Sequence, residues 1–207
     1  MLQAAFQEIQ RSGFQSAGID AILAATNVTK GALYYHFDSK ETLGFAVVEE
    51  IIANFTRDRW LRPMLSEGEA IGVLISVVRR IPTRPKDVRA GCPLLNLAQE
   101  MSPLDERFRK RLESIFLEWQ EGIATLLRKG QSQGTVRRNL NPDLTASFLV
   151  AMVEGYATLA KNAQDAKVWK AGMRNIVEWL RSLRAPRQSR RGGRRLMSKG
   201  RVVKKRQ

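Results

Sequence analysis

Hydrophobic residues recur three or four positions apart along most of the chain. This spacing is typical of amphipathic helices, in which the apolar side chains share one face. It is visible over residues 2–9, 19–23, 33–37, 43–55, 71–78, 94–101, 104–126, 144–159 and 169–183. No segment shows the strict alternation of a half-buried strand. The pattern predicts an all-α protein of about nine helices.

Polar residues and prolines predict where several of these helices begin and end. Residues 38–41 and 66–69 have the spacing of a capping box, with an acidic residue at the fourth position. Residues 102–103 and 141–142 each place proline directly after a capping residue. The prolines and glycine within 82–93 predict a loop.

Residues 17–37 have the organisation of a helix-turn-helix. Two short predicted helices are separated by Thr26-Asn27-Val28-Thr29, where Asn27 tolerates the left-handed conformation of a tight turn. In such a motif the second helix enters the major groove of DNA. Tyr34 and Tyr35 are neighbours, about 100° apart on a helix, so at least one of them must face outward.

Residues 28–41, Val-Thr-Lys-Gly-Ala-Leu-Tyr-Tyr-His-Phe-Asp-Ser-Lys-Glu, resemble the recognition helix and following turn of the TetR family of repressors. Two features depart from the family pattern: Ala17-Gly18 stands where a hydroxyl residue is common, and the first helix begins about one turn short, at Met1. The resemblance implies that double-stranded DNA is contacted by Gly18, Thr29, Lys30, Gly31, Ala32, Tyr34, Tyr35, His36 and Lys40.

The same resemblance implies a three-helix DNA-binding domain over 1–40 and a larger helical domain over 41–184 that binds an effector and forms a homodimer. A two-fold dimer would read a near-palindromic operator. The predicted dimer interface comprises Phe148, Trp169, Met173, Ile176 and Leu180. A stripe of this kind also fits the core of a single chain, and the pattern leaves both interpretations open.

Residues 91–101, together with Glu154-Gly155-Tyr156 and Lys161, resemble a TetR subgroup that senses electrophiles and acrylate-like compounds. That resemblance implies a modifiable thiol at Cys92 beside Lys161, whose ammonium would lower the pKa of the thiol. Two alternatives remain: Cys92 is a small buried hydrophobic residue, or the protein binds a small, mostly apolar effector reversibly. The predicted effector pocket comprises Cys92, Asn96, Phe116, Trp119, Met152, Tyr156 and Lys161.

The net charge of +15 is concentrated at one end of the chain. Residues 185–207 contain ten Lys or Arg and no acidic residue, which leaves +5 for residues 1–184. This composition predicts a disordered basic tail that can hold nucleic-acid phosphates without sequence preference. An architectural DNA-binding protein that uses this tail is therefore the alternative to a sequence-reading regulator.

Other function classes find little support. The single histidine, His36, and single cysteine, Cys92, offer no metal site, and there is no glycine-rich phosphate loop or nucleophile elbow, so we predict no cofactor and no enzyme. Apolar runs such as 148–153 are far shorter than the ~18 residues of a membrane span, which predicts a soluble cytoplasmic protein. We predict a transcriptional regulator, by family habit a repressor, released by a small effector or by cysteine modification.

Overall fold

The structure is a computed structural model, and it describes residues 1–186. The all-α prediction is confirmed: within those residues the only extended pairing is an isolated bridge between Val136 and Arg184. Every helix in the described range is too short or too polar to span a membrane. The predicted disorder of the basic tail falls, from residue 187 onward, outside the described residues.

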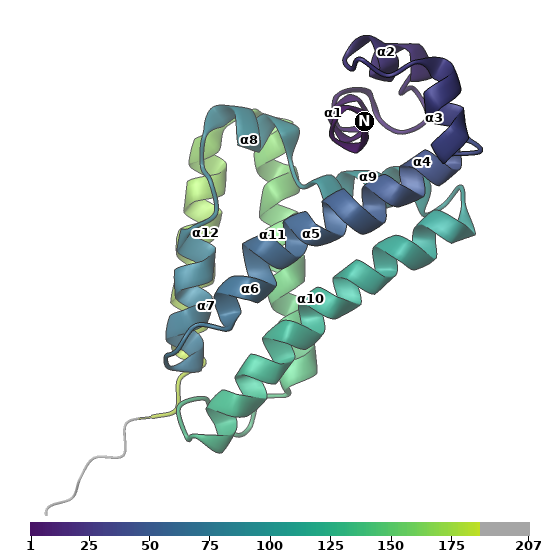
Figure 1. The fold of residues 1–207 in the computed structure, drawn as a ribbon. Coiled ribbons are helices and arrows are strands. Elements are labelled where there is room, and N and C mark those ends of the chain that lie inside the picture. Colours follow the sequence, from purple (N-terminus) through teal and green to yellow (C-terminus); the bar gives the residue numbers. More distant parts are fainter. Residues whose placement is uncertain (187–207) are drawn as a thin grey trace, which may run out of the picture.

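Three short helices form the N-terminal part: α1 (Leu2–Ser12), α2 (Ile19–Ala24) and α3 (Lys30–His36). They are followed by one continuous helical rod that leads away from them (Figure 1). The rod comprises α4 (Lys40–Ala46), α5 (Ala53–Thr56) and α6 (Arg62–Met64), joined by the π-helical segments Val47–Ile52 and Arg57–Leu61.

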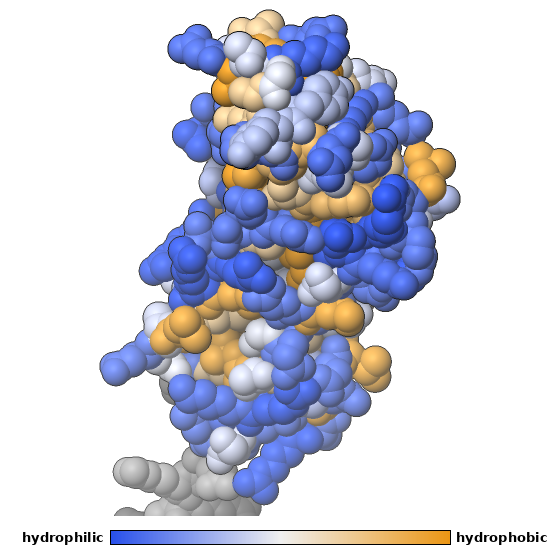
Figure 2. All heavy atoms as spheres, turned by 45° about the vertical axis from the view of Figure 1, so that its right-hand side comes forward, coloured by the Kyte–Doolittle hydropathy of each residue, from blue (hydrophilic) through white to orange (hydrophobic). Residues whose placement is uncertain are grey.

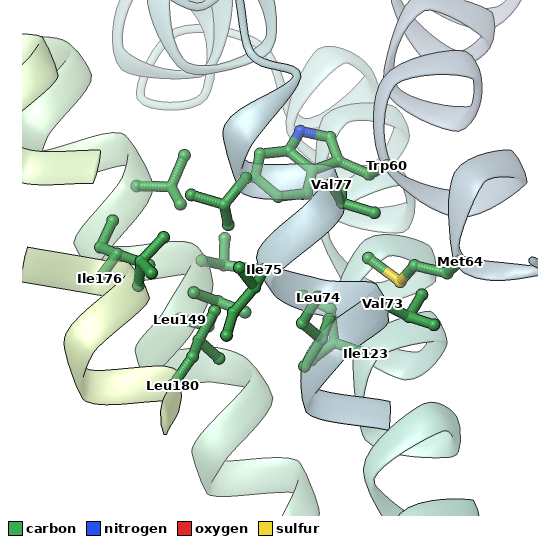
Figure 3. Close-up of a cluster of buried hydrophobic side chains, with 14 of the residues drawn as sticks. Trp60, Met64, Val73, Leu74, Ile75, Val77, Ile123, Leu149, Ile176 and Leu180 are labelled. Carbon is green, nitrogen blue, oxygen red and sulfur yellow. The ribbon is translucent and has the colours of Figure 1, made fainter. Parts of the chain in front are cut away.

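The larger part contains α7 (Ala70–Arg79), α8 (Pro85–Ala90), α9 (Pro93–Met101), α10 (Glu106–Ser132), α11 (Pro142–Ala163) and α12 (Ala166–Ser182). The long α10 runs beside the α4–α6 rod, and α11 packs against α12 (Figure 1). Buried side chains from the rod, α7, α10, α11 and α12 meet in one core, including Trp60, Leu74, Ile123, Leu149 and Ile176 (Figure 3).

A second core joins the N-terminal helices to the larger part. Ile9 and Phe14 are buried together with Leu97 of α9 and Phe108 of α10. The Phe108 ring lies 4.7 Å, centroid to centroid, from that of Phe14. Because the packed interior leaves little free space, α1–α3 cannot shift relative to α9 and α10 without disturbing these contacts.

Some predicted boundaries are wrong. The segment 82–93 is not all loop, because Pro85 starts α8, as proline often does in the first turn of a helix. Ser66 does not cap α7; instead the Glu69 carboxylate accepts hydrogen bonds from the first-turn N–H groups. The helix expected after Ser102 begins at Glu106, capped by Asp105.

Other boundaries are confirmed or move by one residue. Asn141 caps α11, with Pro142 in the first turn, as predicted. The capping box before α4 uses Ser39 and Thr42 rather than Asp38 and Glu41. The face seen in Figure 2 is mostly hydrophilic, and its hydrophobic residues lie in separate patches.

Candidate DNA-reading helix and effector pocket

The inner side of α3 is anchored by packing and by its cap. Leu33 is fully buried, and Phe37, one turn later, is half-buried. The Thr29 hydroxyl accepts a hydrogen bond from the N–H of Ala32 over 3.2 Å, which satisfies one free donor of the first turn. These contacts fix which side of the short helix faces solvent.

The outer side of α3 is open. Tyr35 is 84% exposed and Tyr34 42% exposed, while Lys30, Gly31, Ala32 and His36 are also exposed. A Cβ added at Gly31 would meet nothing within 4 Å, so the backbone itself is accessible there. Lys30 Nζ lies 3.8 Å from a carboxylate oxygen of Asp20, an exposed pair that restrains the lysine weakly. This surface offers a cation, aromatic rings and bare backbone to a groove.

Gly18 and Lys40 flank this helix. Gly18 is the exposed N-cap residue of α2 and contributes no side-chain hydrogen bond. Lys40 Nζ donates to the Gln15 carbonyl over 2.9 Å and lies 5.1 Å from the Phe14 ring centroid. Lys40 thus ties α4 to the turn between α1 and α2, and its predicted phosphate contact stays a prediction.

Glu100, near the end of α9, holds the opposite side of that turn. Its two carboxylate oxygens accept hydrogen bonds from the N–H groups of Phe14, over 2.8 Å, and Gln15, over 2.9 Å. Gly13 precedes them with a φ of 82°. Sequence reasoning missed Glu100, because an acidic residue at a helix end has the pattern of a solvated side chain.

A partly open cavity of about 70 Å³ lies between the rod, α8, α10 and α11. Of the residues predicted for the effector pocket, Cys92, at the N-terminus of α9, and Trp119 of α10 line this cavity. Most of the lining is apolar, with Phe55, Trp60 and Val153 among the contributors. The cavity therefore suits a small molecule that is mostly hydrophobic.

Two polar atoms in the lining of this cavity have no hydrogen-bond partner among residues 1–186: Glu154 Oε2 and Trp119 Nε1. Glu154 is only 7% exposed, and its burial raises the pKa of the carboxyl to about 7. The neighbouring Cys92 thiol partly offsets this rise in pKa. Arg59 also lines the cavity, stacked 4.4 Å from the Phe55 ring centroid, and burial lowers the pKa of its guanidinium.

The predicted activation of Cys92 by Lys161 is wrong. Burial, followed by the charge of Glu154, raises the pKa of the Cys92 thiol well above its ordinary value. Lys161 does not line the cavity; its Nζ donates to Asn96 Oδ1 over 2.8 Å. A thiol in this setting is held in its protonated, less reactive form.

Four further predicted pocket residues lie outside the cavity. Asn96 bonds to Lys161, to the Ala90 carbonyl and, over 3.3 Å, to Gln10 Oε1. The others pack elsewhere: Phe116 against both cores, Met152 against the larger core, and Tyr156 against that core with its hydroxyl accepting from Asn175. On α11 the cavity is lined by 153, 154, 157 and 160, a neighbouring helical face.

The predicted dimer interface also needs correction. Trp169, Met173, Ile176 and Leu180 are buried in the core of the single chain, so they offer no surface to a partner. Phe148 differs, since it is 52% exposed, with its ring 5.3 Å from that of Trp179. Leu144 and Leu159 on the same helix are exposed as well. The spacing of apolar residues along α12 could not show whether they are covered by the same chain or by a partner.

Comparison with known proteins gives matches at both ends of the chain. Residues 1–47 match the family described as "Bacterial regulatory proteins, tetR family", and residues 69–176 match "Tetracyclin repressor-like, C-terminal domain".

Similar proteins include the HTH-type transcriptional repressor DhaR of Mycobacterium sp. (strain GP1), 32% identical over 69% of this chain and 71% of its own length. The transcriptional regulator AcuR of Cereibacter sphaeroides is 31% identical over 78% of this chain and 74% of its own. A TetR transcriptional regulator from Chloroflexus aurantiacus superposes with a TM-score of 0.80 at 28% identity, covering 89% of this chain and 94% of that structure.

Proposed function

Since the chain belongs to the TetR family of transcriptional regulators, we propose that it represses transcription by binding a near-palindromic operator as a homodimer, and that a small effector releases it. The observation that carries the DNA-reading part is the two-sided character of α3. Leu33 is completely buried, while Tyr35 and Lys30 project into solvent. A helix of this kind can enter a major groove while its inner side stays packed against the rest of the protein.

The exposed apolar residues of α11 support the dimer. Leu144, Phe148 and Leu159 lie on one helix at spacings of four and eleven residues, which keeps them on a common side. Large exposed apolar side chains that cluster are typical of interfaces. To read two half-sites, such a dimer needs its recognition helices about 34–36 Å apart, one turn of duplex DNA.

The position of α9 supports release by an effector. The helix begins beside Cys92, in the cavity wall, and Glu100 near its other end holds the α1–α2 turn. A ligand that favours one position of α9 thereby favours one position of the DNA-binding helices α1–α3. A coupling of about 1–3 kcal/mol would weaken operator binding by roughly 5–150-fold. Reversible occupancy fits the protonated thiol better than cysteine modification does.

The experiment is selection of bound duplexes from random DNA, followed by fluorescence anisotropy at fixed salt. We expect a near-palindromic site, a loss of affinity in Tyr35→Ala, and unchanged affinity in Leu117→Ala, a matched exposed residue on α10. A chain ending at residue 186 tests the architectural alternative. If that truncation abolishes all preference for the selected site, the tail and not α3 recognises DNA, and the proposal is wrong.

A further inference from the structure

The cavity holds a hydrogen-bond donor and a hydrogen-bond acceptor that the described chain leaves unused. Trp119 Nε1–H can only donate, and Glu154 Oε2 has no protein donor; both residues line the cavity. Both side chains are more than nine-tenths buried. Buried polar atoms are nearly always paired in native proteins, so two such atoms on residues that line one cavity indicate where a ligand bonds.

We propose that the effector is a small uncharged molecule with an alkyl body and one hydroxyl or primary amide group, which accepts a hydrogen bond from Trp119 and donates one to Glu154. The inference rests on the proposed function, because it takes this cavity as the effector site. It adds the chemical class of the ligand and the two residues that recognise it.

The polar pair of the cavity selects against charged ligands. A carboxylate presents acceptors alone, so beside an ionised Glu154 it would leave Oε2 without a donor and place two negative charges together, although the Arg59 guanidinium in the lining would attract it. An ammonium presents donors alone, leaves Trp119 Nε1–H unpaired, and meets the guanidinium of Arg59 in the same lining. A hydroxyl or amide satisfies both protein atoms at once.

The size and the walls of the cavity define the rest of the ligand. A cavity of roughly 150 Å³ holds benzene, with six non-hydrogen atoms, so 70 Å³ with a partly open side limits the ligand to about three to five such atoms. Phe55, Trp60 and Val88 supply apolar walls around the polar pair. A short alkyl chain fits these walls, because the transfer of its apolar surface from water to an apolar environment is favourable.

The test uses the full chain without DNA and follows the indole N–H resonances of its four tryptophans, with Trp119→Phe to assign one of them. The probes, used at pH 8 where Glu154 is ionised, are 1-butanol and propanamide, compared with 1-chlorobutane, propionate and n-butylammonium, all with five non-hydrogen atoms. We expect the two neutral polar probes to shift the Trp119 resonance and to bind at least tenfold more tightly than the other three. Equal binding of 1-chlorobutane, or tighter binding of either ion, overturns the proposal.

Two variants at the acceptor sharpen the result. Glu154→Gln keeps an acceptor oxygen, so 1-butanol should bind within a fewfold of its wild-type affinity. Glu154→Leu removes the acceptor, so the preference for 1-butanol over 1-chlorobutane should disappear. A preference that survives in Glu154→Leu contradicts the assigned role. Operator binding by the same samples is measured separately. If the ligand prediction fails while the operator is still bound, only the ligand proposal is wrong. If operator binding fails while the ligand prediction holds, only the DNA-binding proposal is wrong.

Discussion

Glu100 Oε2 accepts a hydrogen bond from the backbone N–H of Phe14 over 2.8 Å, although 86 residues separate them in the chain. The partner oxygen accepts from Gln15. Together the two bonds attach the DNA-binding helices to α9, whose other end borders the cavity. In the proposed function, this attachment transmits ligand occupancy to α1–α3, and it can be broken with one substitution.

Glu100→Ala should loosen this attachment. The two N–H groups lose a charged acceptor, so we expect a loss of about 1–3 kcal/mol in the free energy of unfolding. Amide hydrogen exchange at Phe14 and Gln15 should accelerate, whereas exchange in α11 should not. Glu113→Ala, which breaks an exposed pair with Arg109, is the control and should leave both amides protected. Unchanged protection in Glu100→Ala would show that the bonds do not hold the turn.

Gly13→Ala should destabilise the same turn for a different reason. Gly13 has φ 82° and ψ 160°, a region open essentially to glycine, and an added Cβ would lie 3.0 Å from a Glu100 carboxylate oxygen. We expect a loss of about 1–3 kcal/mol, measured by urea unfolding. Gly18→Ala, where φ is −88° and the nearest neighbour of a Cβ lies 4.0 Å away, should change stability by much less. Equal losses in the two variants would argue against this account.

Gly31→Ala should separate folding from DNA binding. The position is helical with open space around it, so alanine should stabilise the protein by up to about 1 kcal/mol. The added methyl group stands on the outer side of α3, where backbone approaches DNA, so operator affinity should fall. A thermal melt and an anisotropy titration on one sample check both effects. A gain in operator affinity would place Gly31 away from the duplex.

Glu154 should make stability depend on pH. Its pKa is raised to about 7 in the folded protein, against an ordinary value of 4.5, so the native state keeps a proton that the unfolded chain releases. Stability contributed by this group is therefore present at low pH and is lost as the pH rises from about 4.5 to about 7, by about 3 kcal/mol in total.

Glu154→Gln removes this titration and leaves Cys92, Arg59 and Asp87 in the cavity wall. Urea unfolding between pH 5 and pH 8 should therefore show a smaller decline for the variant than for the wild type. The variant should be the more stable of the two at pH 8. Parallel pH profiles would mean that Glu154 titrates in the folded protein as it does in water.

Phe148→Glu should weaken the proposed dimer. A charge placed in a desolvated apolar contact lacks a partner, and a tenfold or greater rise in the dimer dissociation constant is expected. Sedimentation velocity at micromolar concentration measures it. Leu117→Glu carries the same change on the exposed side of α10 and should leave the assembly state unaltered. Helix content, followed by circular dichroism, should be equal in both variants.

Local patterns in the chain were enough for the helices, for the helix-turn-helix and for the outward position of Tyr35. Each of these depends on neighbours within about four residues: a cap such as Thr29 or Asn141, or an anchor such as Leu33. Cys92, named through the family resemblance, and Trp119, named from its helical face, both line the cavity, and their contact with an effector stays a prediction. The spacing of apolar and polar residues along the sequence was enough to assign a residue to a helix and to one side of that helix.

What covers each side depends on packing between distant segments, which a spacing of three and four does not encode. Trp169 and Ile176 have the stripe of an interface and yet are covered by the chain itself, while Lys161 turns to Asn96 instead of Cys92. Glu100 and Glu154 look like ordinary helix residues until the fold sets one against the backbone of a remote turn and encloses the other. Their roles arise from burial and from partners tens of residues away, so three-dimensional packing was needed to reveal them.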